Sequence, residues 1–567
     1  ELGRQISCTD ARGNTTRQYY DALGHVIKMT DQSDHIDFQA VYDASGYAVQ
    51  TTDAAGSVTK NEYDWEGNKT KQTDAMGGTV TYTYNGTRQM VQSVDQAGSV
   101  SYATYDGMGN LTSTTGPEEN VKRYTYNSLG QMETESTRGD NQNVYTYNAL
   151  GLKASVENAR GEVSEYTYDK AGRMVAYQDS DGRAEYTYDA NGNVLTAKDA
   201  EGTVTREYDA LNRVTKYTDV HGNTVLYEYD ACGNLAKMTY PTGDIATYTY
   251  DGNHNMTKSA MSDGFVSTFE YNPQNQITKI TNPDGGTVTK TYDGAGRLQT
   301  LNDRDKNGKL LAAYVYTYDA LSRITSELDP VHAVEYRMTY DDLGRLTKRT
   351  EYDTKDQSVL NEETFTYDTA GNITSDSTTG EAGNSYEYGA NNSITSVNGV
   401  QLETDECGNT LHYIQDGKKL DVVYDAKNRI HQIGGDENQY HYDVENNRVS
   451  MSSQGISMTY TYDTSGGRNR LVWMEDQDSQ GTVFVYGADG LMWSKSDGEY
   501  KIYHYDYRGS VVAVTDENGN LTDEIRYNAY GSVVGRTGTD LLIIGYNGRD
   551  GVLTEPNGLL FMRARYY

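Results

Sequence analysis

The chain has 567 residues, of which only 36% are hydrophobic, and it contains 52 Tyr but only 6 Phe and 3 Trp. A thick core needs Leu, Ile, Val and Phe, whereas Tyr suits a surface that is dry beside the ring and wet at the hydroxyl, so we expect a thin wall. The formal net charge of −33 argues against nucleic acid or anionic lipid as a general partner, because phosphates are bound by clustered Lys and Arg.

The ends and the cysteines carry little chemistry. Cys8, Cys232 and Cys407 lie far apart, form no metal-binding spacing and no disulfide framework, and are expected to be small buried hydrophobic residues. The longest aliphatic run, at 541–544, is too short to span a bilayer. The sequence starts at Glu1 with no Met or apolar signal core, so we expect an excised or processed start with any export signal upstream.

A Tyr-Asp or Tyr-Asn pair repeats along the chain. Its tyrosine falls every 20 to 22 residues, at positions 20, 42, 63, 84, 105, 126, 147, 168, 188, 208, 229, 250, 271 and 292. Later copies, at 318, 340, 367, 424, 442, 462, 505 and 527, are spaced less evenly. Self-similarity at one short period indicates an array of a single supersecondary unit.

Each repeat predicts a strand followed by a tight turn. In the segment 246–253, Tyr248 and Tyr250 alternate with threonines, which is the period of a β-strand. The fourth position after the tyrosine is usually Gly, as at Gly172, or Asn, as at Asn212 and Asn428. Both residue types tolerate positive φ, so this position predicts a left-handed residue that closes a hairpin. Three turns break this rule and are expected to be distorted or longer, those with Arg88, His254 and Ser322.

A second strand, such as 193–199, and a second turn, such as 199–202, complete the unit. Two strands in each of more than twenty copies give about fifty strands, and isolated hairpins are marginal in water, so the copies must pair side by side. Two copies per four-stranded blade would exceed the 4–8 blades of a propeller. We therefore predict an all-β protein with almost no helix, a single long sheet that its own twist coils into a spiral around a cavity.

The recurring aspartates could suggest a metal site. Residues 303–308 begin like a calcium loop, with Asp303, Asp305, Asn307 and Gly308 well placed, but the twelfth position is Tyr314 where a bidentate Glu is required. The aspartates precede turns, where a short acid caps backbone N–H groups. We predict no metal and no cofactor.

Other catalytic patterns are also missing. The nine histidines are scattered, with no HExxH, no GxSxG and no P-loop. His504 lies on a predicted strand and is interpreted as a packed or surface residue, and Arg563 and Arg565 as residues that stack on Tyr and pair with acids. We therefore predict no catalytic residues.

The repeated "YDAxG" followed by "TDxxG" resembles the YD repeat of the Rhs family over nearly the whole chain. The end, at 503–534 and 545–567, resembles the Rhs-associated core in a set of matching positions: Gly509, Ser510, Tyr527, Tyr530, Gly531, Gly548, Arg549, Gly558, Leu559 and the run from Arg563 to Tyr567. Relatives include bacterial polymorphic toxins, the shell component of insecticidal toxin complexes, wall-associated proteins and teneurins.

The resemblance implies a hollow shell, a cocoon of YD hairpins at 1–470, closed at one end by a core region at 471–567. In the toxins of this family the shell encloses a C-terminal effector, and an aspartyl autoprotease releases it. The motif with the cleaving aspartates follows the position of Tyr567 and is absent here, and Glu555 is given no protease role because it matches a different element.

Larger apolar residues gather toward the C-terminus, among them Leu471, Trp473, Phe484, Trp493 and Phe561. A wall that is wet on both faces does not need them, whereas a segment packed on another element does. We therefore expect residues 471–567 to fold against the inner surface or end of the spiral as a plug, with Tyr567 pointing into the lumen.

Two functions from different classes follow. The first is a non-catalytic container, secreted or at a cell surface, whose partners are its own C-terminal cargo and a secretion machinery or receptor. The alternative is a surface adhesion or glycan-binding protein, which is disfavoured because such aromatic modules rely on Trp and only Trp65, Trp473 and Trp493 are present. A competent autoprotease is the weakest possibility.

Overall fold

The computed structural model describes residues 3–138, 141–389, 392–415, 417–467, 469–538, 543–563 and 565–567. Regular structure in these ranges consists of β-strands and short 3₁₀ turns, and it includes no α-helix. No helix in these ranges is long and apolar enough to cross a bilayer. The prediction of an all-β chain is confirmed.

The first and larger sheet opens with nineteen strands: β1 (Ser7–Thr9), β2 (Thr15–Tyr20), β3 (Val26–Thr30), β4 (Ile36–Tyr42), β5 (Ala48–Asp53), β6 (Val58–Tyr63), β7 (Lys69–Thr73), β8 (Thr79–Tyr84), β9 (Met90–Val94), β10 (Val100–Tyr105), β11 (Leu111–Thr115), β12 (Val121–Tyr126), β13 (Met132–Arg138), β14 (Asn141–Tyr147), β15 (Lys153–Glu157), β16 (Val163–Tyr168), β17 (Met174–Asp179), β18 (Gly182–Tyr188) and β19 (Val194–Lys198).

It continues with β20 (Thr203–Tyr208), β21 (Val214–Thr218), β22 (Thr224–Tyr229), β23 (Leu235–Thr239), β24 (Ile245–Tyr250), β25 (Met256–Met261), β26 (Val266–Tyr271), β27 (Ile277–Thr281), β28 (Thr287–Tyr292), β29 (Leu298–Arg304), β30 (Leu310–Tyr318), β31 (Ile324–Asp329), β32 (Val334–Tyr340), β33 (Leu346–Asp353), β34 (Val359–Tyr367), β35 (Ile373–Thr378), β36 (Asn384–Tyr388), β37 (Ile394–Val397) and β38 (Val400–Gln401).

The second sheet comprises β39 (His412–Gln415), β40 (Lys418–Tyr424), β41 (Ile430–Ile433), β42 (Asn438–Tyr442), β43 (Arg448–Ser453), β44 (Ile456–Asp463), β45 (Arg470–Asp476), β46 (Gly481–Gly487), β47 (Gly490–Ser496), β48 (Glu499–Tyr505), β49 (Val511–Asp516), β50 (Leu521–Tyr527) and β51 (Val533–Thr537). A small pair, β52 (Leu553–Thr554) and β53 (Leu560–Phe561), follows, and the 3₁₀ turns are η1 (Pro117–Glu119), η3 (Gly435–Glu437) and η4 (Gly548–Asp550).

The strands form antiparallel meanders of 38 and 13 strands, in which neighbours along the chain pair with each other. The prediction of a single continuous sheet is therefore wrong, because the ladder of paired strands ends at β38 and a second one starts at β39. An isolated bridge between Thr404 and Thr410 occupies the gap. The break falls within the longest interval between tyrosines of the predicted repeat, from Tyr367 to Tyr424, where the unit that extends the sheet is lost.

The aspartate of each pair organises its own turn, as Asp209 illustrates. Its Oδ1 accepts hydrogen bonds from the backbone N–H groups of Leu211 (2.9 Å) and Arg213 (3.0 Å). Asn212, with φ of 63°, donates its N–H to the carbonyl of Asp209 at 3.0 Å. An aspartate that caps its own turn beside a left-handed residue explains the spacing of the repeat. Positive φ at the Gly and Asn turn positions is thus confirmed, including Gly172 (81°) and Asn428 (60°).

The expectation of distorted turns at Arg88, His254 and Ser322 is wrong. Their φ angles are 63°, 63° and 61°, the same left-handed conformation as in the other turns. His254 also donates its N–H to the carbonyl of Asp251, which is the same hydrogen bond that Asn212 makes to Asp209. A left-handed L-residue costs about 1–2 kcal/mol, which the hydrogen bonds of the aspartate-capped turn can offset when the residue is not β-branched.

The repeated tyrosine joins each repeat to the one before it. The hydroxyl groups of Tyr208, Tyr229 and Tyr250 donate to the backbone carbonyls of Val194, Val214 and Leu235 at 2.9, 2.8 and 2.8 Å. These acceptors lie 14 or 15 residues earlier, at the start of the preceding strand. Phe would fill the same space but would leave the carbonyl without this donor, which explains why the chain uses Tyr.

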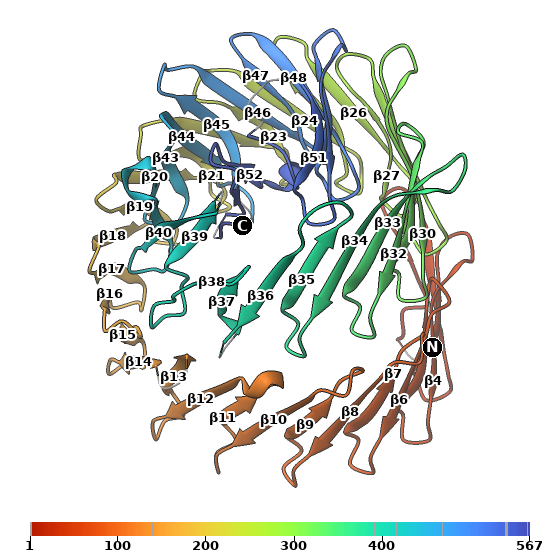
Figure 1. Cartoon of the computed structure of the whole chain (residues 1–567), viewed down its shortest axis with the longest axis vertical. Helices are drawn as coiled ribbons and strands as arrows, with labels where there is room; N and C mark the ends of the chain where they lie inside the picture. Colours follow the sequence, from red (N-terminus) through yellow and green to blue (C-terminus); the bar gives the residue numbers. More distant parts are fainter. Residues whose placement is uncertain are drawn as a thin grey trace.

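The sheet winds as a spiral, and contacts between residues far apart in the sequence show how many residues one revolution uses (Figure 1). Arg12 donates to the carbonyl of Asn272, 260 residues later, and Arg206 pairs with Glu445, 239 residues later. Closer to the C-terminus the separation falls, to 199 residues between Lys290 and Asp489 and 166 between Glu363 and Ala529. Because each revolution uses fewer residues, the spiral narrows toward its C-terminal end.

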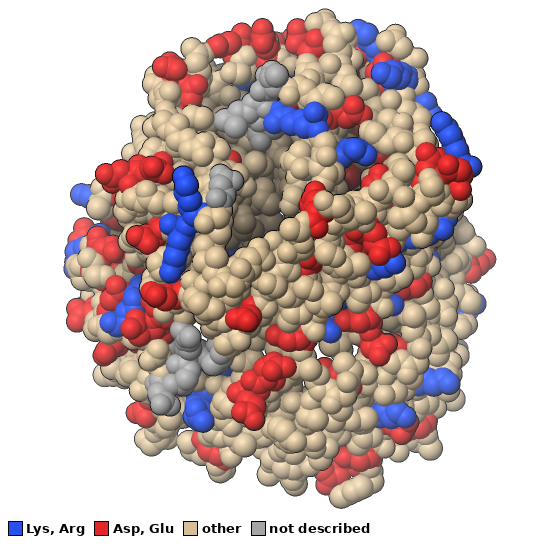
Figure 2. Space-filling model, viewed as in Figure 1, with Lys and Arg blue, Asp and Glu red and all other residues tan. Residues whose placement is uncertain are grey.

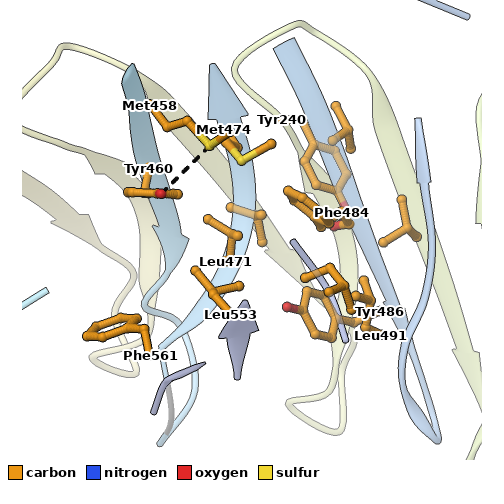
Figure 3. Close-up of a cluster of buried hydrophobic side chains, with 14 of the residues drawn as sticks. Tyr240, Met458, Tyr460, Leu471, Met474, Phe484, Tyr486, Leu491, Leu553 and Phe561 are labelled. Carbon is orange, nitrogen blue, oxygen red and sulfur yellow. Dashed lines mark hydrogen bonds between the residues drawn. The ribbon is translucent and has the colours of Figure 1, made fainter. Parts of the chain in front are cut away.

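The wall changes thickness along the chain. Among the described residues before Ala176, Ala40 is the single hydrophobic side chain that is fully buried, so this part is the thin wall that the composition predicts. From β17 onward the second sheet packs on the first, and one large apolar cluster joins them. Tyr240 donates to the carbonyl of Phe484 at 3.3 Å within this core, shown in Figure 3. The buried Leu, Met and Trp side chains of the described residues all lie in this later part of the chain, from Met238 onward.

Leucines at the same position of the repeat, at the tips of the turns, differ in exposure according to whether another revolution covers them. Leu129, Leu150 and Leu211 on the first revolution are 81%, 71% and 72% exposed. Leu321 on the second revolution is half-buried, since its turn abuts the first: the hydroxyl of Ser57 donates to the carbonyl of Ala320. The same position in the repeat is therefore exposed at the edge of the first revolution that no later revolution covers, which we call the free rim. It is covered where the edges of two revolutions meet, which we call the seam.

We predict that Leu321→Asp lowers the free energy of unfolding by about 1–2 kcal/mol, because a charge would lie in a covered apolar contact. The matched variant Leu211→Asp, at the same repeat position on the free rim, should change it by less than about 0.5 kcal/mol. Urea midpoints of both variants check this. Equal losses would contradict the assignment of the seam.

Candidate functional site

The last residues leave the wall and lie across the second sheet. Residues 543–567 follow the wall strand β51, and the chain doubles back through bridges between Ile544 and Leu553 and between Phe561 and Tyr566. Val511 of β49 donates its N–H to the carbonyl of Gly545 at 3.0 Å. Figure 1 shows the C-terminus within the ring of strands. We name residues 543–567 the terminal segment.

One buried ion pair anchors this segment. Arg448, the first residue of β43, donates from Nη1 to Glu555 at 2.7 Å, and both side chains are almost completely buried. The guanidinium carbon lies 3.9 Å from the ring centroid of Phe561 and 4.9 Å from that of Tyr460. Nη1 also donates to the hydroxyl of Tyr566 at 3.2 Å. A cation stacked on aromatic rings and paired with one acid holds both strands of the segment at once.

Burial sets the chemistry of this pair. Burial raises the pKa of the Glu555 carboxyl above its ordinary value, and the charge of Arg448 opposes that shift. Neighbouring polar contacts add to the anchor: the Asn557 amide donates to the Tyr440 hydroxyl at 3.1 Å, and Gln415 donates to the Asn557 carbonyl at 2.9 Å. Glu555 therefore anchors the terminal segment to the second sheet. No pattern in the sequence predicted Arg448 as its partner.

Apolar packing completes the attachment (Figure 3). Leu553 and Phe561 of the terminal segment join the same buried cluster as Leu471 and Leu491 of the second sheet. The apolar signal near the C-terminus is therefore explained by packing, as expected, although Leu541 and Leu542 lie outside the described residues.

The region 471–567, expected to pack as a plug, consists of wall strands followed by the terminal segment. Most of the region 471–567 continues the wall, because β45 pairs with β44 and the ladder runs on to β51. These strands also pack on the first sheet, through Phe484 of β46 and His504 of β48, and the terminal segment in turn packs across the second sheet. Tyr567 is 59% exposed, and its position within the ring agrees with the expected direction toward the lumen.

A second buried pair joins two revolutions. His504 of β48 is 1% exposed and its Nδ1 lies 2.7 Å from Oδ2 of Asp303 in β29, while Nε2 lies 3.0 Å from the Thr515 hydroxyl. Of the two alternatives that the sequence left open for His504, a packed or a surface residue, the structure shows the packed one. Asp305, the other candidate calcium ligand, caps its own turn through the N–H groups of Asn307 and Lys309.

Two smaller predictions are wrong. Cys8 and Cys232 are exposed instead of buried, because Cys8 lies on the edge strand β1 and Cys232 at a turn tip. Arg563 neither stacks on a Tyr nor pairs with an acid in the described part of the chain, and it donates to the backbone carbonyl of Asp550 at 2.9 Å.

The sequence matches the family described as Teneurin YD-shell over residues 151–239 and 287–567. The chain belongs to the teneurin YD-shell family. The sequence also matches the family described as RHS Repeat, at residues 105–142 and 229–266.

Curated relatives match part of the shell. The tRNA3(Ser)-specific nuclease WapA of Bacillus spizizenii is 29% identical over 245 residues, which is 40% of this chain and 10% of the relative. Teneurin-3 of Danio rerio is 28% identical over 291 residues, 45% of this chain and 10% of the relative. The matched part is thus about a tenth of the length of these relatives.

Solved structures share the fold over almost the whole chain. The Photorhabdus luminescens Tc holotoxin pore with the TccC3-D651A mutation has a TM-score of 0.82 at 14% identity, covering 98% of this chain and 34% of that one. The TcdB2-TccC3 crystal structure has a TM-score of 0.76 at 14% identity, covering 99% and 37%. The prediction of a spiralling YD-repeat shell is confirmed.

We predict that Glu555→Leu releases the terminal segment, because it leaves the Arg448 cation buried without its acid, a loss of about 3–5 kcal/mol. Hydrogen exchange should then rise at residues 543–567 while the strands of the first sheet keep their protection. The double variant Arg448→Met with Glu555→Leu removes both charges and should restore most of the protection. Exchange that is unchanged in the single variant would contradict the anchor.

We predict that the seam at His504 weakens as the pH rises. Burial alone would lower the pKa of His504, but the charge and hydrogen bond of Asp303 outweigh it, aided by the charge of Asp284, and the pKa lies above its ordinary value. A raised folded-state pKa means that this stabilisation is complete below the ordinary pKa of about 6.5 and is lost as pH rises through the folded value.

The urea midpoint should therefore fall more between pH 6 and pH 9 in the unmodified protein than in His504→Gln. His332, whose pKa is raised first by its hydrogen bond to Asp329, contributes a parallel fall that the variant retains. Identical pH profiles for the two proteins would refute the contribution of His504.

Proposed function

We propose that the chain is a non-catalytic enclosing wall, part of a longer secreted or surface-exposed protein, that holds a polypeptide following Tyr567 inside its lumen. The observation that carries this proposal is the path of the terminal segment. A buried anchor at Arg448 and Glu555 holds the segment, and its end lies within the ring of strands instead of on the outer rim. An outward display function would need no such anchor.

The narrowing of the spiral supports the same role. Each later revolution uses fewer residues, which brings strands such as β48 and β49 over the face of the earlier sheet. On this basis we propose 1–470 as the shell and 471–567 as an Rhs-associated core that contributes to closure. Closely joined sheet edges also limit the pairing of free strands with other proteins.

The names of the relatives fit a wall that accompanies different activities. The WapA relatives are named as nucleases and the Tc structures as parts of a toxin, and this chain matches only a fraction of each. We propose that this stretch supplies enclosure and that catalysis, cofactors and metals belong elsewhere. The glycan-binding alternative loses support, because Trp493 is fully buried and Trp473 is half-buried, which leaves Trp65 as the single exposed Trp for stacking on a sugar.

The test compares protection at the two ends. The same flexible thirty-residue peptide with one protease site is fused after Tyr567 in one protein and before Glu1 in a second, as a matched control. We expect cleavage after Tyr567 to be at least tenfold slower, because the lumen excludes the protease, and to reach the control rate in denaturing urea. Equal rates in native buffer would refute enclosure.

A further inference from the structure

We propose that the cavity between the terminal segment and the second sheet is an oxyanion-binding site, suited to a carboxylate of an acidic peptide or to inorganic phosphate. The cavity has a volume of about 420 Å³ and is lined by Arg448 and Arg470 from the sheet and by Arg549 and Arg563 from the terminal segment. Guanidinium groups match both kinds of oxyanion through paired N–H donors.

The positive charge of this cavity contrasts with the net negative charge of the whole chain, which has 82 acidic and 49 basic residues. In a regular turn the arginine pairs with the aspartate of the same turn, as Arg213 pairs with Asp209 at 2.6 Å. The cavity lining contains one acid, Asp550, against those four arginines. After Glu555 cancels Arg448, the balance is three arginines minus one aspartate, a net charge of +2.

A longer turn frees Arg470 from the usual partner. In a regular repeat the arginine stands four residues after the aspartate, as Arg213 follows Asp209, and the two side chains pair. Arg470 stands seven residues after Asp463 and opposite it across the strands. In the described part of the chain Arg470 has no ion pair, and its guanidinium carbon lies 5.4 Å from the ring centroid of Tyr486.

Two buried donors of the cavity lining also lack a partner. Arg448 is fully buried, yet its Nε and Nη2 have no hydrogen-bond partner among the described residues, and the Glu555 oxygen Oε2 accepts no hydrogen bond there either. An unsatisfied buried donor costs about 1–3 kcal/mol, so the wall favours a bound acceptor oxygen. Figure 2 shows that the surface is hollowed near the centre of this face. Arg470 and Arg563 are exposed, so a ligand in solution can reach their guanidinium groups.

The experiment uses residues 1–567 and two probes, inorganic phosphate and a fluorescent hexapeptide of Asp and Glu, with an Asn and Gln hexapeptide as the neutral control. We expect saturable binding of at least one anionic probe and none of the neutral peptide. The double variant Arg470→Gln with Arg563→Gln should raise the Kd at least tenfold, because it removes two of the three uncancelled arginines.

The matched control is Arg565→Gln, which removes an exposed arginine two residues from Arg563 that is not part of the lining and should leave the Kd unchanged. Binding of the peptide or of phosphate alone supports the site and identifies the source of the oxyanion. No saturable binding, or equal loss in Arg565→Gln, overturns it. If the double variant fails to fold, Arg470→Gln alone gives the same decision. This experiment uses no cargo, so a negative result would not affect the proposal of enclosure. Failure of the protease test would likewise not affect the oxyanion site.

Discussion

The structure depends on one local constraint, the aspartate-capped turn beside a left-handed residue. The carboxylate of Asp209 holds two backbone N–H groups of its own turn, and Asn212 closes it. The hydroxyl of the preceding Tyr208 then fixes the repeat to the one before. These contacts lie within about one repeat, so every copy forms the same hairpin, and the sheet can grow without a conventional core.

The spiral follows from the accumulation of small rotations between strands. Right-handed twist turns a long ribbon around an axis, and the edges of successive revolutions meet at a seam of side chains such as Arg206 and Glu445. Surface ion pairs are individually weak, so a seam gains from being long and from covering apolar turn tips such as Leu321. Where the revolutions shorten, the sheets overlap and buried pairs such as His504 with Asp303 replace edge contacts.

The terminal segment shows how a repeat array acquires a unique feature. Arg448 and Glu555 are more than a hundred residues apart and belong to no repeated pattern, yet they form an ion pair as deeply buried as that of His504 with Asp303. A buried pair is costly to break from one side, so it suits a single holding point. The cavity beside it joins arginines from the sheet and from the segment, which only this folding path brings together.

The sequence by itself determined the all-β class, the hairpin unit and the left-handed turn positions, because these depend on spacing and on contacts within about one repeat. It misjudged Arg88, His254 and Ser322, whose turns are capped by Asn85, Asp251 and Asp319 and keep the common conformation without Gly or Asn at the left-handed position. The tertiary structure alone decided the shortening revolutions, the path of the terminal segment across the second sheet and the partner of Glu555. Those features arise from twist summed over hundreds of residues, where a small change per strand decides which distant side chains meet, and no local pattern records that sum.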